Sequence, residues 1–476
     1  MNNQFPVVLV GNTLAQMIAA LEIAKKGENI AIVNNSKNWG GHFSPIVLNG
    51  DPFDAGMILF EYTAFNFDSK TKSLLSYNPE IRNDTGRFCS LIEQYISQYI
   101  DAHEIEAPKM YLAGAIYDDI LIANKLDSMQ LLPNLKEIRN ELRVISQTEV
   151  KQELHASNKI HSDLFLSSSY ETVSKYNHGD TFHNTIIEPY SKKLINLSTK
   201  YVIALYHRVP WLPLFYPETL LSYIEGKPQK LPDTVFSYPT NTCSSMLGKI
   251  IFDKIHSHKN ITIINEKIKS VKVDPENNVV LYFENGFSVS TPKLGWGLPN
   301  SGLLQALGLE EHVKQYDKCS IALLFVKVPS AHVKTNFSVL NIIDENILTY
   351  RITNQTNCTG QTAEITKLVL EINPDYVTSI HKELNQDELT NLMLHELVKM
   401  KIITSVESVC YKKIVQLKNA LMLPTQNNRE SYIEETRLVK KQLPFIDLFG
   451  PASGFFSSSL NDQVVQGLKF VELQET

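Results

Sequence analysis

The chain has 476 residues, of which 43% are hydrophobic and 20% are charged, and its formal net charge is −6. This length exceeds one ordinary hydrophobic core, so we expect two or more lobes, and the negative charge argues against nucleic acid as a partner. Five scattered cysteines without a C-x-x-C pair, and no apolar run long enough to cross a membrane, argue against structural zinc, a disulfide framework and a membrane span, and favour a cytoplasmic protein.

The first motif is a strand, a tight turn, a helix and a returning strand at the N-terminus. An apolar run at 7–10 ends at Gly11, a helical pattern covers 14–26, and a second apolar run follows at 30–33. Short apolar runs around a helix are typical of a parallel βαβ unit that directs a helix N-terminus at a pyrophosphate. The pattern therefore predicts a nucleotide-binding unit.

The glycine fingerprint of this turn is incomplete. The three positions of G-x-G-x-x-G are Gly11, Thr13 and Gln16, and Asn34 stands where an acidic residue normally binds the ribose. The Thr13 hydroxyl could donate to a phosphate, and the Asn34 amide could accept from a ribose hydroxyl without the strength of a charge. A purely structural βαβ unit and a working dinucleotide site both remain open, the latter with Leu14 and Ala15 in the binding turn.

A glycine pair follows the second strand, as Trp39-Gly40-Gly41-His42, and an Asp54-Ala55-Gly56 sequence comes soon after. At this point the chain resembles the flavoprotein group that contains amine oxidases, protoporphyrinogen oxidases and UDP-galactopyranose mutases. The resemblance implies that the backbone at Gly40, Gly41 and His42 lies along the flavin and the pyrophosphate of FAD. The family usually has arginine beside this pair, and this chain has Trp39 and His42.

The chain from about residue 61 to 206 is predicted to be mostly helical and to form an inserted substrate lobe. Apolar residues at three- and four-residue spacing over 88–100 predict a long amphipathic helix, and 110–117 predicts a strand. The histidines here lack the spacing of a metal site, so no metal is expected.

The segment 185–218 combines Glu188-Pro189-Tyr190 with a proline-punctuated aromatic stretch that contains Arg208. It resembles the Y-x-x-K and R-x-P stretches of the mutases, which implies that Arg208 contacts a substrate diphosphate. A guanidinium suits that role because its planar fork binds phosphate bidentately. A structural or solvated arginine is the alternative.

A Tyr238-Pro239 pair then precedes a helix predicted over 243–256 and a β-meander with an Asn285-Gly286 hairpin turn. This order resembles the second cofactor segment of the same flavoproteins. The resemblance implies that the backbone near Ile268 lies beside the adenine and that Tyr238 faces the substrate.

Predicted strands at 320–328, 337–343, 348–352 and 365–372 form a broad sheet that would cover the substrate cavity, and a helix is predicted over 386–400. Tyr350-Arg351-Ile352 resembles the T-R-I strand of the mutases, which implies a second diphosphate contact from Arg351. An outward-facing strand arginine is the alternative.

The chain ends with Gly450-Pro451-Ala452 and a helix that starts near Asn461 and Asp462. In the flavoprotein group such a helix directs its N-terminus at the flavin and stabilises negative charge there. Pro451 replaces the arginine of the family.

The order of these motifs predicts an α/β protein with a Rossmann-like FAD-binding lobe (1–60, 219–300 and 426–476) and an inserted mixed α+β substrate lobe (61–218 and 301–425). Three functions follow. The first is an FAD-dependent oxidoreductase in which a small molecule transfers hydride to flavin N5, without an assigned catalytic side chain. The second is a mutase-like flavoenzyme acting on a nucleotide-linked sugar. The third is a flavin-less binding or partner subunit, and a homodimer or a protein partner remains open.

Overall fold

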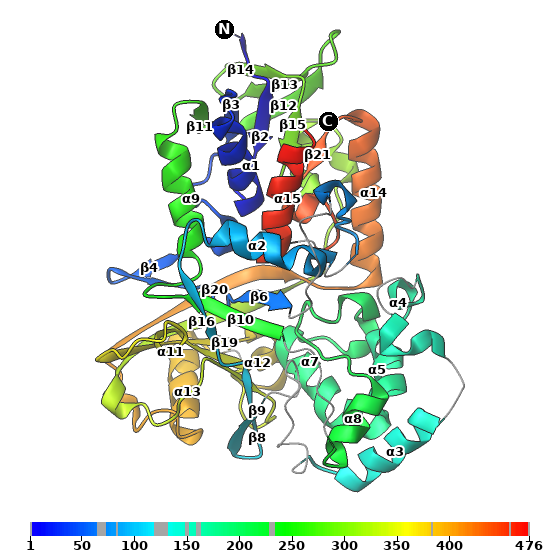
Figure 1. Cartoon of the computed structure of the whole chain (residues 1–476), viewed down its shortest axis with the longest axis vertical. Coiled ribbons are helices and arrows are strands. Elements are labelled where there is room, and N and C mark those ends of the chain that lie inside the picture. The colour runs from blue at the N-terminus through cyan, green and yellow to red at the C-terminus, as the bar shows by residue number, and fades with distance from the viewer. Residues whose placement is uncertain are drawn as a thin grey trace.

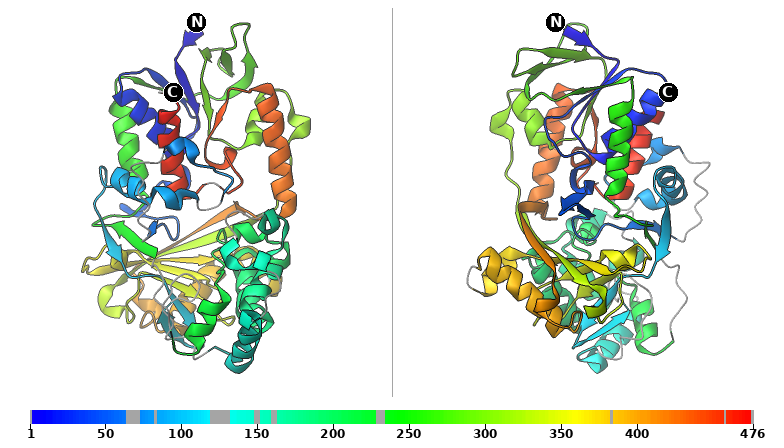
Figure 2. Two further views of the ribbon diagram at one scale, coloured as in Figure 1. Left: turned by 45° about the vertical axis from the view of Figure 1, so that its right-hand side comes forward. Right: turned by 90° about the vertical axis from the view of Figure 1, so that its left-hand side faces the viewer.

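The computed structural model describes residues 2–63, 73–81, 84–118, 132–147, 152–158, 163–227, 234–381, 384–456 and 458–474. The elements form an upper lobe, which contains both termini, and a lower part in which a broad sheet lies beside a group of helices (Figures 1 and 2). Within these ranges no helix is long and apolar enough to cross a membrane.

A five-stranded parallel sheet forms the centre of the upper lobe. Its three central strands are short, apolar and buried on both faces, as in sheets that are covered by helices on each side. The order is β11 (Ile261–Ile264), β3 (Ile30–Val33), β2 (Val7–Val10), β15 (Leu294–Trp296) and β21 (Asp447–Leu448).

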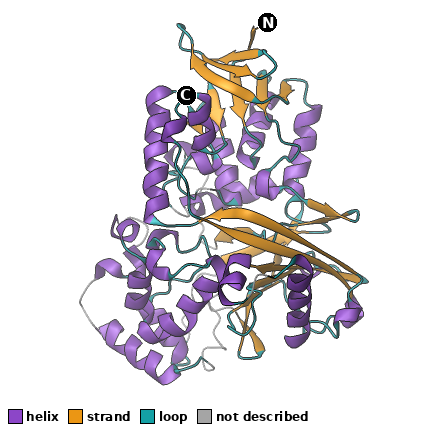
Figure 3. Ribbon diagram, turned by 180° about the vertical axis from the view of Figure 1, so that it is seen from behind, coloured by secondary structure: helices purple, strands orange, loops and turns teal. Residues whose placement is uncertain are grey.

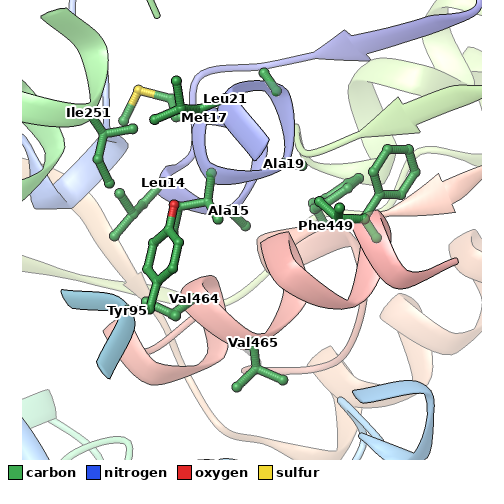
Figure 4. Packing of buried hydrophobic residues seen from close by; sticks show 14 of the residues in the cluster. Leu14, Ala15, Met17, Ala19, Leu21, Tyr95, Ile251, Phe449, Val464 and Val465 are labelled. Atoms are coloured by element: carbon green, nitrogen blue, oxygen red, sulfur yellow. The ribbon is translucent and has the colours of Figure 1, made fainter. Parts of the chain in front are cut away.

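One face of this sheet packs against four helices that share one hydrophobic core. They are α1 (Leu14–Lys25), α2 (Cys89–Ile96), α9 (Met246–Ser257) and α15 (Leu460–Glu472). Figure 4 shows this core, with Leu14 and Ala15 of α1 close to Val464 of α15. The first and the last helix of the chain are therefore neighbours.

The opposite face is covered by α10 (Asn300–Ala306), α14 (Gln426–Gln442) and a second sheet. This sheet has the order β1 (Asn2–Gln4), β14 (Ser288–Thr291), β13 (Val279–Phe283) and β12 (Ile268–Val273). Strands β13 and β14 are antiparallel, and Gly286 between them has a φ of 84°, so the predicted Asn-Gly hairpin is confirmed.

The lower part contains a seven-stranded sheet, whose long strands cross the molecule in Figure 3. The order is β20 (Tyr411–Met422), β16 (Lys318–Pro329), β19 (Ile365–Ile372), β18 (Arg351–Asn354), β17 (Val339–Ile342), β8 (Lys109–Leu112) and β9 (Ala115–Asp118). Helices α12 (Pro374–Ile380) and α13 (Gln386–Lys399) pack on one face, and the hairpin of β4 (Ile46–Leu48) and β5 (Asp51–Phe53) packs on the other.

The prediction of a single strand over 110–117 is wrong, because the chain reverses at Ala113 and Gly114, with φ of 52° and 85°, to form the β8–β9 hairpin. The helix predicted over 88–100 is also shorter than expected, since α2 ends at Ile96.

A group of short helices lies beside the sheet, and a three-stranded sheet lies between this group and the upper lobe (Figure 1). The helices are α3 (Leu135–Gln147), α4 (Asp163–Ser167), α5 (Tyr170–His178), α6 (Asp180–Phe182), the π-helix η8 (His183–Ile187), α7 (Glu188–Ile195) and α8 (Pro217–Ile224). The small sheet has the order β6 (Phe60–Thr63), β10 (Thr234–Pro239) and β7 (Ala102–Ile105), and α11 (Gln355–Cys358) follows β18.

Candidate functional site

The turn between β2 and α1 is filled by the side chain of Gln16. Gly11 has a φ of 125°, which glycine adopts without strain, and Thr13 caps the helix by accepting a bond from the Gln16 amide. The Gln16 carboxamide accepts from the Thr13 amide at 3.3 Å, which completes a capping box. The same carboxamide also donates to the Val10 carbonyl. A Cβ atom at Gly297 would lie 2.2 Å from Gln16 Oε1. Gln16 thus occupies the inside of the turn where the fingerprint has its third glycine.

Helix α15 covers the next residues of this turn. The Ala15 amide donates to Gln463 Oε1 at 3.0 Å, and Leu14 is fully buried. A Cβ atom at Gly467 would lie 2.7 Å from the Ala15 carbonyl oxygen, so the two helices are in close contact. The structure therefore places Leu14 and Ala15 behind side chains of α15.

The Gly450 segment lies at the same corner of the lobe. Its amide donates to Gln466 Oε1 at 2.5 Å, and a Cβ atom at Gly450 would lie 3.5 Å from Thr13 Cγ2. The turns after β2 and after β21 are therefore adjacent, although about 440 residues separate them in the sequence.

The glycine pair also packs on the α1 turn. Gly40 has a φ of 97°, forms a bridge with Thr13, and donates its amide to the Asn12 carbonyl at 2.7 Å. Helix α9 approaches the following residues so closely that a Cβ atom at Gly248 would lie 2.8 Å from the Phe43 carbonyl oxygen. Gly40 and Gly248 thus allow three segments to meet.

Asn34, at the end of β3, uses its side chain within its own loop. The carboxamide accepts from the Ser36 amide at 3.0 Å and donates to the Ser36 carbonyl at 2.9 Å. Its acceptor oxygen is therefore already bonded, unlike the free acidic group expected of a ribose contact.

Gly41 and His42 face open space. No atom lies within 4 Å of a Cβ atom built at Gly41, and both residues are exposed. Desolvation lowers the pKa of His42 to about 4, although its bond to the backbone of Ser458 opposes this effect. That bond places His42 beside the start of α15. We call the region around Gly41, His42 and the first turn of α15 the central region.

The first turn of α15 belongs to this central region. Ser459 caps the helix, and the Asp462 carboxylate accepts from Ser459 and, at 2.9 Å, from the Tyr77 hydroxyl. Among the described residues, no acceptor pairs with the backbone amides of Leu460 and Asn461. Asn461 is partly exposed, so this helix end offers unpaired amides and partial positive charge to a ligand.

Arg208 lies near the same helix end. Its guanidinium forms an ion pair with Glu61 at 2.8 Å and lies 5.4 Å from the centre of the Trp211 ring. The Glu61 carbonyl accepts from the Asn461 side chain at 2.8 Å, which links the pair to α15. Both charged side chains are about 30% exposed, so a ligand can reach them.

Arg351 is placed differently, because it is locked to the neighbouring strand. Its Nε and Nη2 atoms bond to the two oxygens of Glu371 at 2.7 and 2.6 Å, and Glu371 is only 4% exposed. Glu371 also accepts from the Met57 amide at 3.0 Å. The structure thus gives Arg351 a buried bidentate partner.

Tyr238 is fully buried, and its hydroxyl donates to Asp54 at 2.6 Å. The Asp54 carboxylate also accepts from the amides of Ser244 and Ser245, just before α9. Burial raises the pKa of Asp54, and these hydrogen bonds oppose that effect. The D-x-G aspartate and Tyr238 therefore hold the start of α9 together.

The structure brings together the predicted cofactor residues at the turn of α1, the glycine pair, Gly450 and the start of α15. Ile268 begins β12 on the other side of the parallel sheet, in the core that also contains β3. Sequence reasoning missed Glu61, Glu371 and Gln463, and each becomes recognisable only through its partner in the fold.

The amides of Leu460 and Asn461 and the open space at Gly41 are available to a ligand. Asn12 and Thr13 are partly exposed, but the Asn12 side chain donates to the Asn38 carbonyl, and the Thr13 amide and hydroxyl bond to Gln16. The polar groups of Ala15 and Asn34 are already bonded within the chain, so they are not available to the ligand as they stand.

The structure is similar in fold to solved flavoproteins of the group that contains the amine oxidases and the UDP-galactopyranose mutases, so the predicted resemblance and a mixed α/β fold are confirmed. A reduced UDP-galactopyranose mutase matches with a TM-score of 0.70 and 13% identity, over 98% of this chain and 93% of that one. Cyclohexylamine oxidase from Brevibacterium oxydans matches with a TM-score of 0.62 and 13% identity, over 99% of this chain and 100% of that one.

Putrescine oxidase with bound putrescine matches with a TM-score of 0.61 and 11% identity, over the full length of both chains. No family model and no curated protein sequence matches the chain.

Proposed function

We propose that this protein binds FAD in its upper lobe and acts as an oxidoreductase on a small molecule. The observation that supports this most strongly is the start of α15, where unpaired amides of the central region lie beside the Arg208–Glu61 pair. The ring would lie at Gly41, His42, Asn461 and Asp462, and the diphosphate at Asn12 and Thr13. Gly11, Leu14, Ala15, Gly40 and Gly450 form the frame of this site, and Ile268 lies toward the adenine.

FAD, when bound, supplies the hydride-accepting chemistry. The chain contributes position and electrostatics: the N-terminus of α15 stabilises negative charge in the central region, and the Ser459 and Tyr77 hydroxyls fix the Asp462 carboxylate. Arg208 and Glu61 offer one positive and one negative group to a substrate. No side chain is assigned as a catalytic acid or base.

The absorption spectrum of the purified protein tests this proposal. We expect flavin absorption bands at about 370 and 450 nm, either in the protein as purified or after FAD is added. Gly41→Asn should weaken FAD binding by about tenfold or more, because it puts a side chain into the open space at Gly41 where the ring is proposed to lie. Gly50→Asn is the matched control, since Gly50 also has positive φ and open space around its Cβ position but lies in the β4–β5 turn. Equal FAD affinity in the two variants would count against this placement.

A second candidate is a flavin-less binding protein with the same fold. The observation that favours it is the closure of the α1 turn by Gln16 and Gln463. A colourless protein that gains no flavin band with added FAD would establish this candidate over the first.

A mutase-like reaction on a nucleotide-linked sugar would draw on Arg208 as a diphosphate contact. Thermal-shift measurements with UDP-sugars and with amines separate this reaction from amine oxidation, because a ligand of the folded state raises the melting temperature. Loss of a UDP-sugar shift in Arg208→Ala would support the mutase.

A further inference from the structure

A buried polar chain runs through the helices of the lower part. Ser174 Oγ lies 3.0 Å from His178 Nδ1 and 2.8 Å from His183 Nδ1. His183 Nε2 lies 3.1 Å from Thr199 Oγ1, which in turn bonds to the Glu188 carboxylate. At the other end, His178 Nε2 accepts from the backbone amide of Phe215 at 2.9 Å. Ser174, His178, His183 and Thr199 are at most 1% exposed.

The two ends of this chain fix the position of every proton in it. Because the Phe215 amide donates to His178 Nε2, neutral His178 carries its proton on Nδ1 and donates to Ser174. Ser174 has one hydrogen and a further neighbour in the Tyr170 hydroxyl. It donates to His183 Nδ1 because the Glu188 end of the chain requires the His183 proton on Nε2.

Neutral His183 then carries its proton on Nε2 and donates to Thr199, and the Thr199 hydroxyl donates to Glu188. The opposite direction would leave two oxygens, Thr199 Oγ1 and the carboxylate, in contact without a hydrogen between them. All hydrogen bonds of the chain therefore point from Phe215 toward Glu188.

The local fold produces this alignment. His178 is the last residue of α5, and His183 begins the π-helix η8, whose wider turn accompanies a change in side-chain direction along the helix. Thr199 follows α7 in a short turn, and its amide also donates to Glu188 at 2.9 Å.

The segment that this chain holds is the one that carries Arg208. Besides the Phe215 amide, the Pro213 carbonyl accepts from the Tyr170 hydroxyl, and His207 Nδ1 lies 2.5 Å from the Leu212 carbonyl oxygen. Helix α5 thus contacts the 207–216 segment at two points, through Tyr170 at its start and His178 at its end.

We propose that His178, oriented through Ser174, His183 and Thr199 by the Glu188 carboxylate, is a positioning residue that holds the Arg208-bearing segment, and that acid releases this segment at Phe215. Protonation of His178 places an N–H on Nε2 that faces the Phe215 N–H, so that contact breaks. Protonation of His183 is accommodated, since the Ser174 hydroxyl can turn and accept from both rings. His178 is therefore the residue at which acid acts.

The charged groups around the chain agree with two neutral rings. Desolvation, together with the neighbouring His183, lowers the pKa of His178 to about 3. Desolvation also lowers the pKa of His183 to about 4, Lys175 adds to this effect, and Glu188, Glu171 and Asp180 oppose it. These groups lie on α5, α6 and α7. Helix α3 also packs against α5 and α6, and its Glu141 carboxylate accepts from the Thr181 amide and hydroxyl between the two histidines.

Nitrogen NMR of the full chain with ¹⁵N-labelled histidine tests the proton positions directly, without any ligand. At pH 7 we expect the Nδ1–H form for His178 and the Nε2–H form for His183, with assignments from single variants. Thr199→Val keeps the shape but removes the acceptor, so it should move the His183 proton to Nδ1 and leave His178 unchanged. An Nε2–H form of His178, or a cationic ring at pH 7, would overturn the proposal.

Hydrogen exchange at the Phe215 amide tests the positioning role. Ser174→Ala removes the acceptor of His178 and should speed exchange at Phe215 by about fivefold, by the usual net value of one hydrogen bond, and Ser174→Thr should restore protection. Ser222→Ala is the matched control, because the Ser222 hydroxyl donates only to the Thr219 carbonyl within α8.

In the unmodified protein, protection of Phe215 relative to Leu220 of α8 should fall as the pH is lowered from 7 to 4. Unchanged exchange in Ser174→Ala, or a constant ratio with pH, would refute the positioning role. Because none of these readouts involves FAD, they are independent of the proposed function.

Discussion

The two arginines that the sequence analysis singled out have different surroundings, and this difference predicts different consequences for their loss. Arg351 and Glu371 are 12% and 4% exposed, whereas Arg208 and Glu61 are 27% and 30% exposed. Removing the partner of a buried carboxylate strongly destabilises the folded protein, because it leaves a buried charge unpaired. An exposed ion pair contributes little to stability.

We therefore expect Arg351→Met to lower the free energy of unfolding by about 3–5 kcal/mol and Arg208→Met by about 1 kcal/mol or less. Urea unfolding of both variants measures these values. In ligand binding we expect the reverse order, with Arg208→Met the more damaging variant for any anionic substrate. Comparable losses of stability in Arg351→Met and Arg208→Met would contradict the greater burial of the Arg351–Glu371 pair.

The arginines could be found from sequence because guanidinium groups beside prolines or within a strand are conspicuous there. Their partners could not, since Glu61 and Glu371 lie 147 and 20 residues away from them and no local pattern links them. The same holds for Gln463, whose contact with Ala15 spans 448 residues.

At the scale of elements, the contact between α1 and α15 depends on one small residue. A Cβ atom at Gly467 would lie 2.7 Å from both the Ala15 carbonyl oxygen and Ile18 Cγ2 (Figure 4 shows the surrounding core). Gly467→Ala must push the helices apart and should lower the free energy of unfolding by about 1–3 kcal/mol. It should also weaken ligand binding in the central region, because α15 begins there.

Gly302→Ala is a suitable control for this variant in thermal unfolding. Gly302 lies in α10, and the nearest atom to its Cβ position is 3.9 Å away, so alanine fits and should stabilise the helix by about 0.5–1 kcal/mol. A Gly467→Ala protein as stable as Gly302→Ala would contradict the close contact.

Helix α7 carries a second element-scale prediction, through the buried Lys193. Its ammonium donates to the carbonyls of Ile342 at 2.7 Å and Asp344 at 2.8 Å, and desolvation lowers its pKa to about 7 although Glu396 and Asp344 oppose this. At pH values between about 7 and 10.5, the usual pKa of lysine, Lys193 binds more protons in the unfolded chain than in the folded one. This group therefore makes the free energy of unfolding rise with pH from about 7 upward.

Lys193→Met should remove this contribution, so urea unfolding at pH 7, 8 and 9 should give a flatter pH dependence than in the unmodified protein. Lys192→Met is the control, since Lys192 is about half exposed and pairs with Glu188 at the surface. A slope that Lys193→Met leaves unchanged would show that the lysine is charged in the folded protein.

At the scale of the whole molecule, the lobes are interleaved. The parallel sheet of the upper lobe takes strands from near residues 7, 30, 261, 294 and 447, and the lower sheet takes β8 and β9 from before and its other strands from after residue 300. We expect one cooperative thermal transition, with the same midpoint by circular dichroism and by tryptophan fluorescence. Two separated transitions would show that the lobes unfold independently.

The order of elements could be predicted from sequence because short apolar runs, helical spacing and turn residues are local signals. The βαβ unit, the meander hairpin and the strand at 365–372 follow from such signals, whereas the β8–β9 turn was missed because Ala113 gives no sign of its positive φ. The site was harder to predict. Its turns can be recognised from local sequence, but the bond between Gln463 and the Ala15 amide joins the two ends of the chain. The predicted lobe boundaries and cofactor residues stay predictions.

The closure of the α1 turn by Gln16 and Gln463 has a consequence for how the protein is made. Their carboxamides accept from the Thr13 and Ala15 amides, which would otherwise need another acceptor. A newly synthesised polypeptide can therefore complete this corner of the fold without a bound small molecule, so we expect its assembly to be independent of the supply of one.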